Sequence, residues 1–132
     1  MNSIQQSLAI FKKFNFERLP VGVKFLPNKP DGIEKLDKIL DFCEMLPEAQ
    51  EGNAFYVIPK LQKGTVNYVA FAPLDKLSFE PDVLIVTANV SQAEILLRAH
   101  SYSSGRMWTA KGTSVIGCAW LYVYPYISGE LN

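Results

Sequence analysis

The spacing of hydrophobic residues predicts an amphipathic helix at the start of the chain. Ser3 followed by Gln6 has the pattern of a capping box, which would begin the helix. We therefore expect a helix over residues 3–15. The apolar positions that recur at helical spacing in it are Leu8, Phe11 and Phe14.

A strand, a helix and a second strand are predicted next. Residues 21–26 and 54–58 are short apolar runs bounded by prolines and turn residues, which indicates strands. Between them, Asp31 can cap a helix that would end near Met45, because Pro47 disfavours helix in the residue before it. This order is long enough for a right-handed βαβ crossover. The predicted apolar face of the helix consists of Ile33, Leu36, Leu40 and Cys43.

Two further strands are the clearest in the sequence. They cover residues 65–73 and 81–88, and the second has almost no polar interruption, which is typical of a central strand covered on both faces. The linker 74–80 is too short for a helical crossover, so the two strands are either antiparallel or not adjacent. A mixed sheet follows from this connection.

The C-terminal third begins with another predicted helix. Ser91 with Glu94 forms a capping-box pattern, the helix would run to about Tyr102, and Gly105 would end it. The segment 113–130 has the β-branched and aromatic content of a strand, but a helix that ends before Pro125 is the interpretation we favour. We expect one α/β or α+β domain over residues 1–132, with a mixed sheet of about four strands and flanking helices.

Charge and composition exclude several classes of partner. Lys and Arg number 13 and so do Asp and Glu, so the zero net charge gives no electrostatic reason to expect nucleic acid. No apolar run is long enough to cross a membrane, and the first 16 residues lack the pattern of a signal peptide. With only two cysteines, the chain is expected to be cytoplasmic, with reduced thiols.

Polar residues at the end of the strand 81–88 form the first candidate site. Asn89 and Ser91 lie where a strand passes into a helix, and ligands of open α/β sheets bind at such corners. A helix N-terminus also favours anions. The alternative is plain helix capping, which explains Ser91 without a ligand.

The segment 100–106 forms the second candidate site. His100 could act as an acid, base or metal ligand, but a cation also suits the last turn of a helix. We interpret His100 as a helix-end residue and the residues after it as a loop that contacts a small-molecule ligand. The expected contacts are Tyr102, Ser103, Ser104 and Arg106.

Cysteines and aromatic residues form two further groups. Cys43 and Cys118 are either buried core thiols or two ligands of an incomplete metal site. The alternating aromatic residues near the C-terminus could stack a flat ligand, pack in the core or form a subunit interface. These residues are Trp120, Tyr122, Tyr124 and Tyr126. No catalytic triad, phosphate loop or metalloprotease motif is present, so the sequence assigns no reaction.

Four blocks of the chain resemble one known family. They are "RLPVGVKFL", "LDFCEML", "FEPDVLIVTANVSQAEILLRAHSYSSG" and "GCAWLYVYPYISGELN". They are similar to the domain of unknown function 169 family of archaea and anaerobic bacteria. The resemblance implies a shortened or gapped member, because relatives carry an extra stretch near Lys60 and Leu61 and continue after Asn132. It also implies that relatives hold four cysteines, two of them at Cys43 and Cys118, which could bind an iron–sulfur cluster or zinc.

Taken together, these patterns predict a protein that binds a small molecule or cofactor in anaerobic metabolism. The first alternative is a redox or metal accessory protein that uses Cys43 and Cys118. The second is a structural module that forms homo-oligomers through its C-terminal aromatic residues. The binding function predicts a pocket at the Ser101–Arg106 segment.

Overall fold

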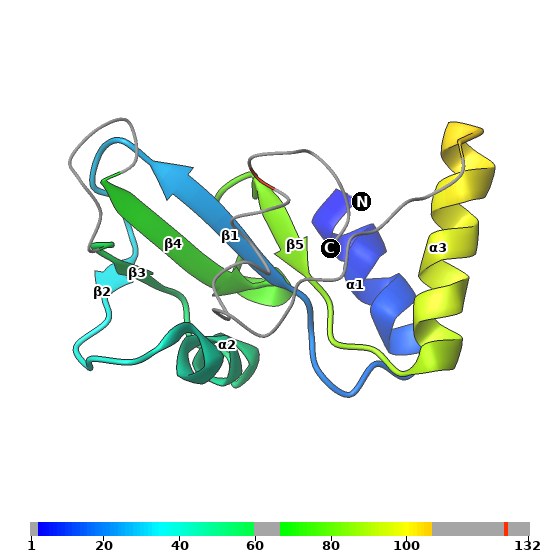
Figure 1. Ribbon diagram of the computed structural model, residues 1–132, viewed down its shortest axis with the longest axis horizontal. Coiled ribbons are helices and arrows are strands. Elements are labelled where there is room, and N and C mark those ends of the chain that lie inside the picture. The colour runs from blue at the N-terminus through cyan, green and yellow to red at the C-terminus, as the bar shows by residue number, and fades with distance from the viewer. Residues whose placement is uncertain (1–2, 60–66, 107–125, 127–132) are drawn as a thin grey trace.

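A mixed sheet in the order β2-β3-β4-β1-β5 forms the centre of the computed structural model (Figure 1). The structure describes residues 3–59, 67–106 and Tyr126. The strands are β1 Val21–Leu26, β2 Glu34–Lys35, β3 Phe55–Val57, β4 Tyr68–Pro73 and β5 Val83–Ile85. The helices of this part of the chain are α1 Ser3–Lys13, α2 Phe42–Gln50, the 3-10 turn η1 Leu74–Lys76, and α3 Val90–Ser104. The predicted mixed sheet with flanking helices is confirmed as an α+β domain, and the short β2 is the strand that the sequence did not reveal.

Strand β1 lies between the two strands that the short linker 74–80 connects. It pairs antiparallel with β4, where Val21 faces Pro73, and antiparallel with β5, where Val21 faces Ile85. Strand β3 is antiparallel to β4, whereas β2 is parallel to β3. The prediction that the two clearest strands are either antiparallel or not adjacent is therefore confirmed, because β1 separates β4 from β5.

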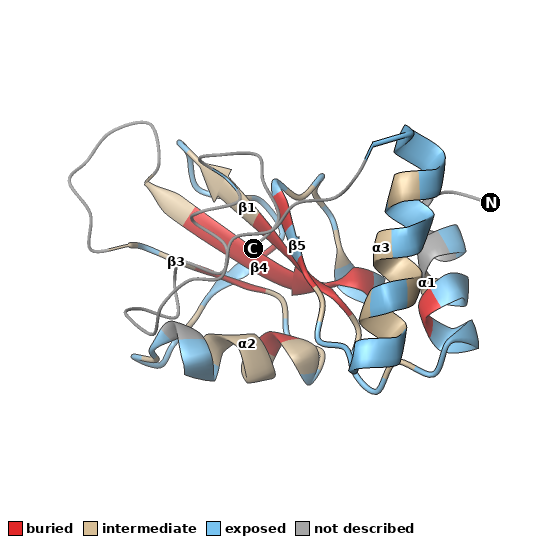
Figure 2. Cartoon of the chain, turned by 45° about the vertical axis from the view of Figure 1, so that its right-hand side comes forward, coloured by how far each residue is buried: buried red, intermediate tan, exposed pale blue. Residues whose placement is uncertain are grey.

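The main core lies on the face of the sheet that α2 covers. Side chains alternate along β1, so that Val21 and Val23 are fully buried on this face, with Phe25 packed beside them. Figure 2 shows the buried residues concentrated in the central strands and on the sheet side of α2. The other buried members of this core are Ala49, Phe55, Val69, Phe71, Val83 and Ile85.

The predicted helix over residues 31–45 is wrong. The chain forms the strand β2 there, and α2 begins only at Phe42, after Asp41, whose backbone N–H donates to Glu44 Oε1 (3.4 Å). Pro47 lies inside α2 although it cannot donate a backbone hydrogen bond. Packing of Met45, Leu46 and Ala49 against the sheet offsets that loss, so tertiary packing decides where this helix lies. The predicted parallel relation of the two flanking strands holds, because β1 and β3 are both antiparallel to β4 and α2 lies between them in the chain. Strand β2, which α2 also connects to β3, is the parallel neighbour of β3.

Strand β5 is an edge strand of the described sheet and not a central one. It pairs only with β1 among the described strands, and Leu84 at its middle is 43% exposed. Its apolar sequence therefore does not reflect burial on both faces. The hydrophobic residues of one face, Val83 and Ile85, account for its place in the core.

Helices α1 and α3 lie side by side beyond β5, at one end of the sheet (Figures 1 and 2). Gln92 joins them, because its Nε2 donates to the carbonyl oxygens of Phe14 (3.0 Å) and Asn15 (3.1 Å) at the end of α1. Helix α3 has no buried residue. Within the described residues, no helix is both long and apolar enough to cross a membrane.

Candidate functional site

The connection from β4 to β5 crosses the face of the sheet opposite α2. It passes over Gly22 of β1, where a Cβ atom would lie 2.5 Å from Leu77 Cδ1 and 3.1 Å from Pro81 Cβ. Because glycine has no side chain, the connection can lie directly on the strand. Residues 77–81 therefore form a layer over this second face.

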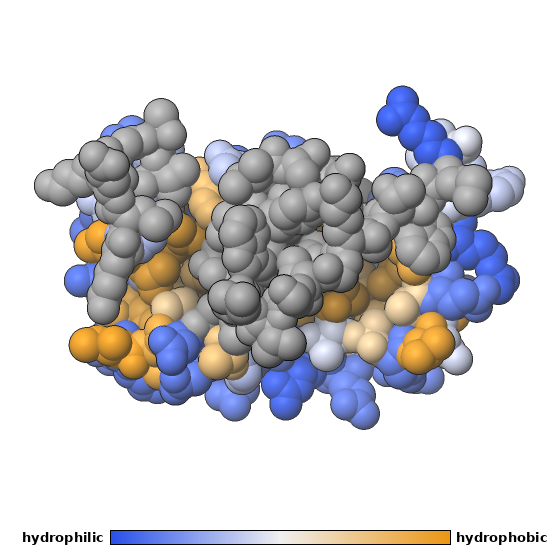
Figure 3. Space-filling model, in the orientation of Figure 1, coloured by the Kyte–Doolittle hydropathy of each residue, from blue (hydrophilic) through white to orange (hydrophobic). Residues whose placement is uncertain are grey.

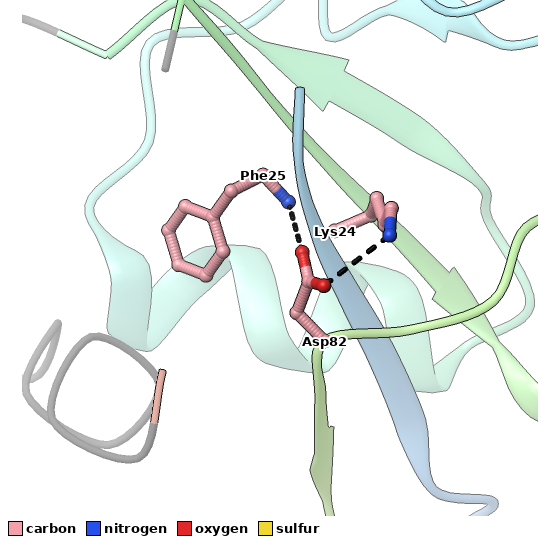
Figure 4. Close-up of polar contacts among 3 residues, drawn as sticks. All are labelled: Lys24, Phe25 and Asp82. Atoms are coloured by element: carbon pink, nitrogen blue, oxygen red, sulfur yellow. Dashed lines mark hydrogen bonds and ion pairs between the residues drawn. The ribbon is translucent and has the colours of Figure 1, made fainter. Parts of the chain in front are cut away.

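Asp82 attaches the end of this connection to β1 (Figure 4). Its Oδ2 accepts the backbone N–H of Phe25 (2.9 Å), its Oδ1 lies 3.2 Å from Lys24 Nζ, and its own N–H donates to the Val23 carbonyl (2.8 Å). The carboxylate thus supplies an acceptor for the Phe25 N–H, which lies two residues beyond Val23, the last residue of β1 that pairs with β5. Since Lys24 and Asp82 are both partly exposed, the ion pair adds little stability by itself.

Asn67 forms two hydrogen bonds to the chain where β1 ends. Its side-chain Nδ2 donates to the Pro27 carbonyl (3.0 Å), and its backbone N–H donates to the Leu26 carbonyl (3.0 Å). The loop of residues 27–31 therefore leaves the strand in a defined direction. The two prolines of this loop, Pro27 and Pro30, restrict its backbone further.

A hollow of about 330 Å³ lies between the loop 27–31 and the crossing connection. Its apolar lining includes the loop prolines and also Leu26, Ile33 and Phe79. These last three belong to or pack against a second hydrophobic cluster around Tyr56 and Ala70. Its polar lining comes from Asn28, Lys29, Asp31 and Ser78. An apolar floor with a few polar groups at its rim is the usual form of a small-molecule site. We call this region the loop hollow.

A second hollow of about 550 Å³ lies along α3. The lining residues that the structure describes all belong to α3. Glu94 and Arg98 form an ion pair with each other across one helical turn within it. The remaining described lining residues are Val90, Ala93, Leu97 and Ser101.

Hydrophobic residues are also exposed elsewhere on the surface. Figure 3 shows them on both sides of the viewed face, above a mostly hydrophilic lower rim.

Asn89 caps α3, in place of the predicted Ser91. Asn89 Oδ1 accepts the N–H of Gln92 (2.9 Å), and Gln92 Oε1 accepts the N–H of Asn89 (3.1 Å), so the capping box lies two residues earlier than predicted. The Ser91–Glu94 pattern is therefore wrong as a cap. Ser91 is exposed on the first turn of α3. A contact of either Asn89 or Ser91 with an anion stays a prediction.

The segment predicted as a binding loop after His100 is helical. Helix α3 continues to Ser104 and ends at Gly105, whose φ of 68° lies in the left-handed region. Ser103 and Ser104 donate from their hydroxyls to the His100 carbonyl (3.3 and 2.7 Å), so both satisfy the helix end. Tyr102 is 92% exposed. Ligand contacts of Tyr102, Ser103, Ser104 and Arg106 stay predictions, and none of these four lines either hollow.

The cysteines are placed only in part. Cys43 is exposed on the first turn of α2, so its interpretation as a buried thiol is wrong. Cys118 lies outside the described residues, as do Trp120, Tyr122 and Tyr124. Tyr126 is described, and its ring stacks on Phe25 at a centroid distance of 4.1 Å. In the described ranges, no three residues of metal-ligating type cluster, and the predicted iron–sulfur or zinc site is untested.

Sequence reasoning missed the loop hollow. Its described residues come from two distant stretches, 26–33 and 78–79, and neither stretch carries a known motif. The one local signal was the pair Pro27 and Pro30, which marks a restricted loop with charged residues between and after the prolines. Only the crossing connection, which brings Phe79 against this loop, turns the stretch into a concave surface.

Comparison with known proteins gives one match. The family DUF169, described as "Uncharacterised ArCR", matches residues 55–132, which is more than half of the chain. No match was found among curated proteins or among solved structures. The matched region begins at β3, so it includes Ser78, Phe79 and all of α3, whereas the loop 27–31 precedes it. The chain therefore belongs to the DUF169 family.

Proposed function

We propose that this protein binds a small organic molecule in the loop hollow. The observation that carries the proposal is a concave surface with an apolar floor whose rim bears Lys29 and Asp31. Its volume of about 330 Å³ lies at the lower end of the range of about 300–1,000 Å³ that is common for ligand pockets. The occupant would be no larger than a single ring with a short polar tail.

The way in which the hollow is built supports this function. Asn67 fixes the Pro27 carbonyl on one side, and Asp82 fixes the crossing connection on the other. Walls that are held before the ligand arrives lose little conformational freedom on binding, which favours affinity. We extend the proposal to anaerobic metabolism in the cytoplasm, as the DUF169 resemblance and the low cysteine content suggest.

The test is a titration of the ¹⁵N-labelled full chain with 3-phenylpropan-1-ol, a neutral probe with one ring. We expect concentration-dependent chemical-shift changes that are concentrated in the backbone amides around the hollow. A Ser78→Trp variant should abolish these changes, because the indole would fill the hollow from its exposed rim. The amides expected to respond are those of Asn28, Lys29, Asp31, Ile33, Ser78 and Phe79.

The matched control is Ser91→Trp, which places the same side chain at an exposed serine on α3. Ser91→Trp should leave binding of the probe unchanged. Shifts spread evenly over the protein, or shifts that survive in Ser78→Trp, would contradict the proposed site. The redox and oligomerising functions stay alternative predictions, because Cys118 and most of the aromatic residues that they need lie outside the described residues.

A further inference from the structure

We infer that the ligand of the loop hollow carries both a carboxylate and an ammonium group on an apolar body, as an apolar amino acid does. This inference rests on the proposed function and specifies its ligand class. It follows from the charges at the rim, from their lack of partners within the described protein, and from the apolar floor beneath them.

Lys29 and Asp31 lie two positions apart on one short loop, and both line the hollow. Within the described ranges, three ion pairs form, and they join Lys24 to Asp82, Lys38 to Glu48 and Arg98 to Glu94. Neither Lys29 nor Asp31 takes part in them. Pro30 between the two residues fixes its own φ and disfavours a helical conformation at Lys29, so the backbone that carries both charges is restricted.

The presence of one positive and one negative charge at the rim determines which ligand binds best. A ligand with a carboxylate alone would gain from Lys29 but would also face the carboxylate of Asp31. A ligand with an ammonium group alone would face Lys29 in the same way. A molecule that carries both groups pairs each charge with its opposite and leaves neither charge at the rim unmatched.

The floor of the hollow selects the remainder of the ligand. Leu26, Ile33 and Phe79 offer aliphatic and aromatic surface and no charge. A hydrocarbon side chain, branched or aromatic, would displace water from this surface favourably. The Ser78 hydroxyl beside Phe79 supplies one further donor and acceptor for the polar end of the ligand.

The experiment compares four probes that share a phenyl ring and differ in charge. They are phenylalanine, 3-phenylpropanoate, 2-phenylethylamine and 3-phenylpropan-1-ol. Each is titrated into the ¹⁵N-labelled full chain, and the dissociation constant is taken from the amides around the hollow. We expect phenylalanine to bind at least about tenfold more tightly than each of the other three.

Two variants separate the roles of the charges. Lys29→Gln should weaken phenylalanine about tenfold without weakening 2-phenylethylamine, and Asp31→Asn should weaken phenylalanine about tenfold without weakening 3-phenylpropanoate. Both residues are exposed, so neither substitution is expected to unfold the protein. Lys35→Gln, at an exposed lysine of β2 that does not line the hollow, is the control and should change nothing.

The outcomes distinguish the inference from the proposed function. If all four probes bind equally well and Ser78→Trp still abolishes binding, the hollow is a binding site but its ligand is not defined by the two charges. That result overturns the inference alone. If none of the four shifts the amides around the hollow, the proposed function fails together with the inference.

Discussion

Gly22 is the residue on which the crossing of the sheet depends. A Cβ atom at this position would lie 2.5 Å from Leu77 and 3.1 Å from Pro81. The Leu77 side chain is flexible, whereas the proline ring is not, so the connection as a whole would have to move. We predict that Gly22→Ala lowers the free energy of unfolding by about 1–3 kcal/mol, measured by urea denaturation.

Leu77→Ala provides the control for this prediction. It removes the nearer of the two contacts, so the cost of Gly22→Ala should be smaller in the Leu77→Ala background than in the natural sequence. Equal costs in both backgrounds would show that the connection does not press on β1 at this point.

Asp82 is a second single residue that stabilises the fold, because its carboxylate accepts the Phe25 N–H. We predict that Asp82→Ala lowers the free energy of unfolding by about 1–2 kcal/mol, because the Phe25 N–H loses its acceptor. Asp82→Asn keeps an acceptor oxygen and should cost less than about 1 kcal/mol, since the ion pair with Lys24 is partly exposed. A larger loss for Asp82→Asn than for Asp82→Ala would contradict the role of the Phe25 contact.

At the scale of elements, two variants test which residue caps α3: Asn89, as in the structure, or Ser91, as the sequence predicts. Asn89→Ala should destabilise α3 by about 1 kcal/mol, whereas Ser91→Ala should leave it nearly unchanged. Because α3 has no buried residue, the effect should appear as fraying of its first turn, measured by the Cα chemical shifts of residues 90–94. If Ser91→Ala destabilised α3 more than Asn89→Ala did, Ser91 would be the cap, as the sequence predicts.

The second helix shows why local patterns failed at this scale. Residues 33–43 have helical spacing of apolar residues, and yet the chain forms β2 there and begins α2 at Phe42. Intrinsic preferences differ by less than 1 kcal/mol per residue for most residues, so a parallel pairing with β3 and the burial of Ala49 can outweigh them. The sequence revealed the order of strand, helix and strand but not the bounds of the helix.

At the scale of the whole molecule, the order of the strands determines which apolar residues hold the fold together. Phe71 of β4 is 0% exposed, whereas Leu84 of the edge strand β5 is 43% exposed. We predict that Phe71→Ala lowers the free energy of unfolding by about 3–5 kcal/mol, and Leu84→Ser by less than about 1 kcal/mol, in urea denaturation. A large cost for Leu84→Ser would indicate that β5 is covered on both faces, as its sequence predicts.

Local signals in the sequence predicted the structure of several short stretches correctly. The β-branched and aromatic run at Val21–Leu26 specified β1 to the residue, and Gly105 specified the end of α3, because these signals act within a few residues. The short linker 74–80 correctly restricted the relation between β4 and β5. The blocks that resemble DUF169 also identified the family.

Which surfaces meet depends on contacts between distant parts of the folded chain. The place of β5 at the edge, the layer of residues 77–81 over Gly22 and the hollow between Phe79 and the loop 27–31 all depend on pairings between distant parts of the chain. Such contacts form because burial of apolar surface favours one arrangement of the whole chain, and no local spacing encodes that arrangement. In the sequence, Lys29 and Asp31 are therefore indistinguishable from ordinary charged residues of a loop. In the folded protein, they lie at the rim of a hollow.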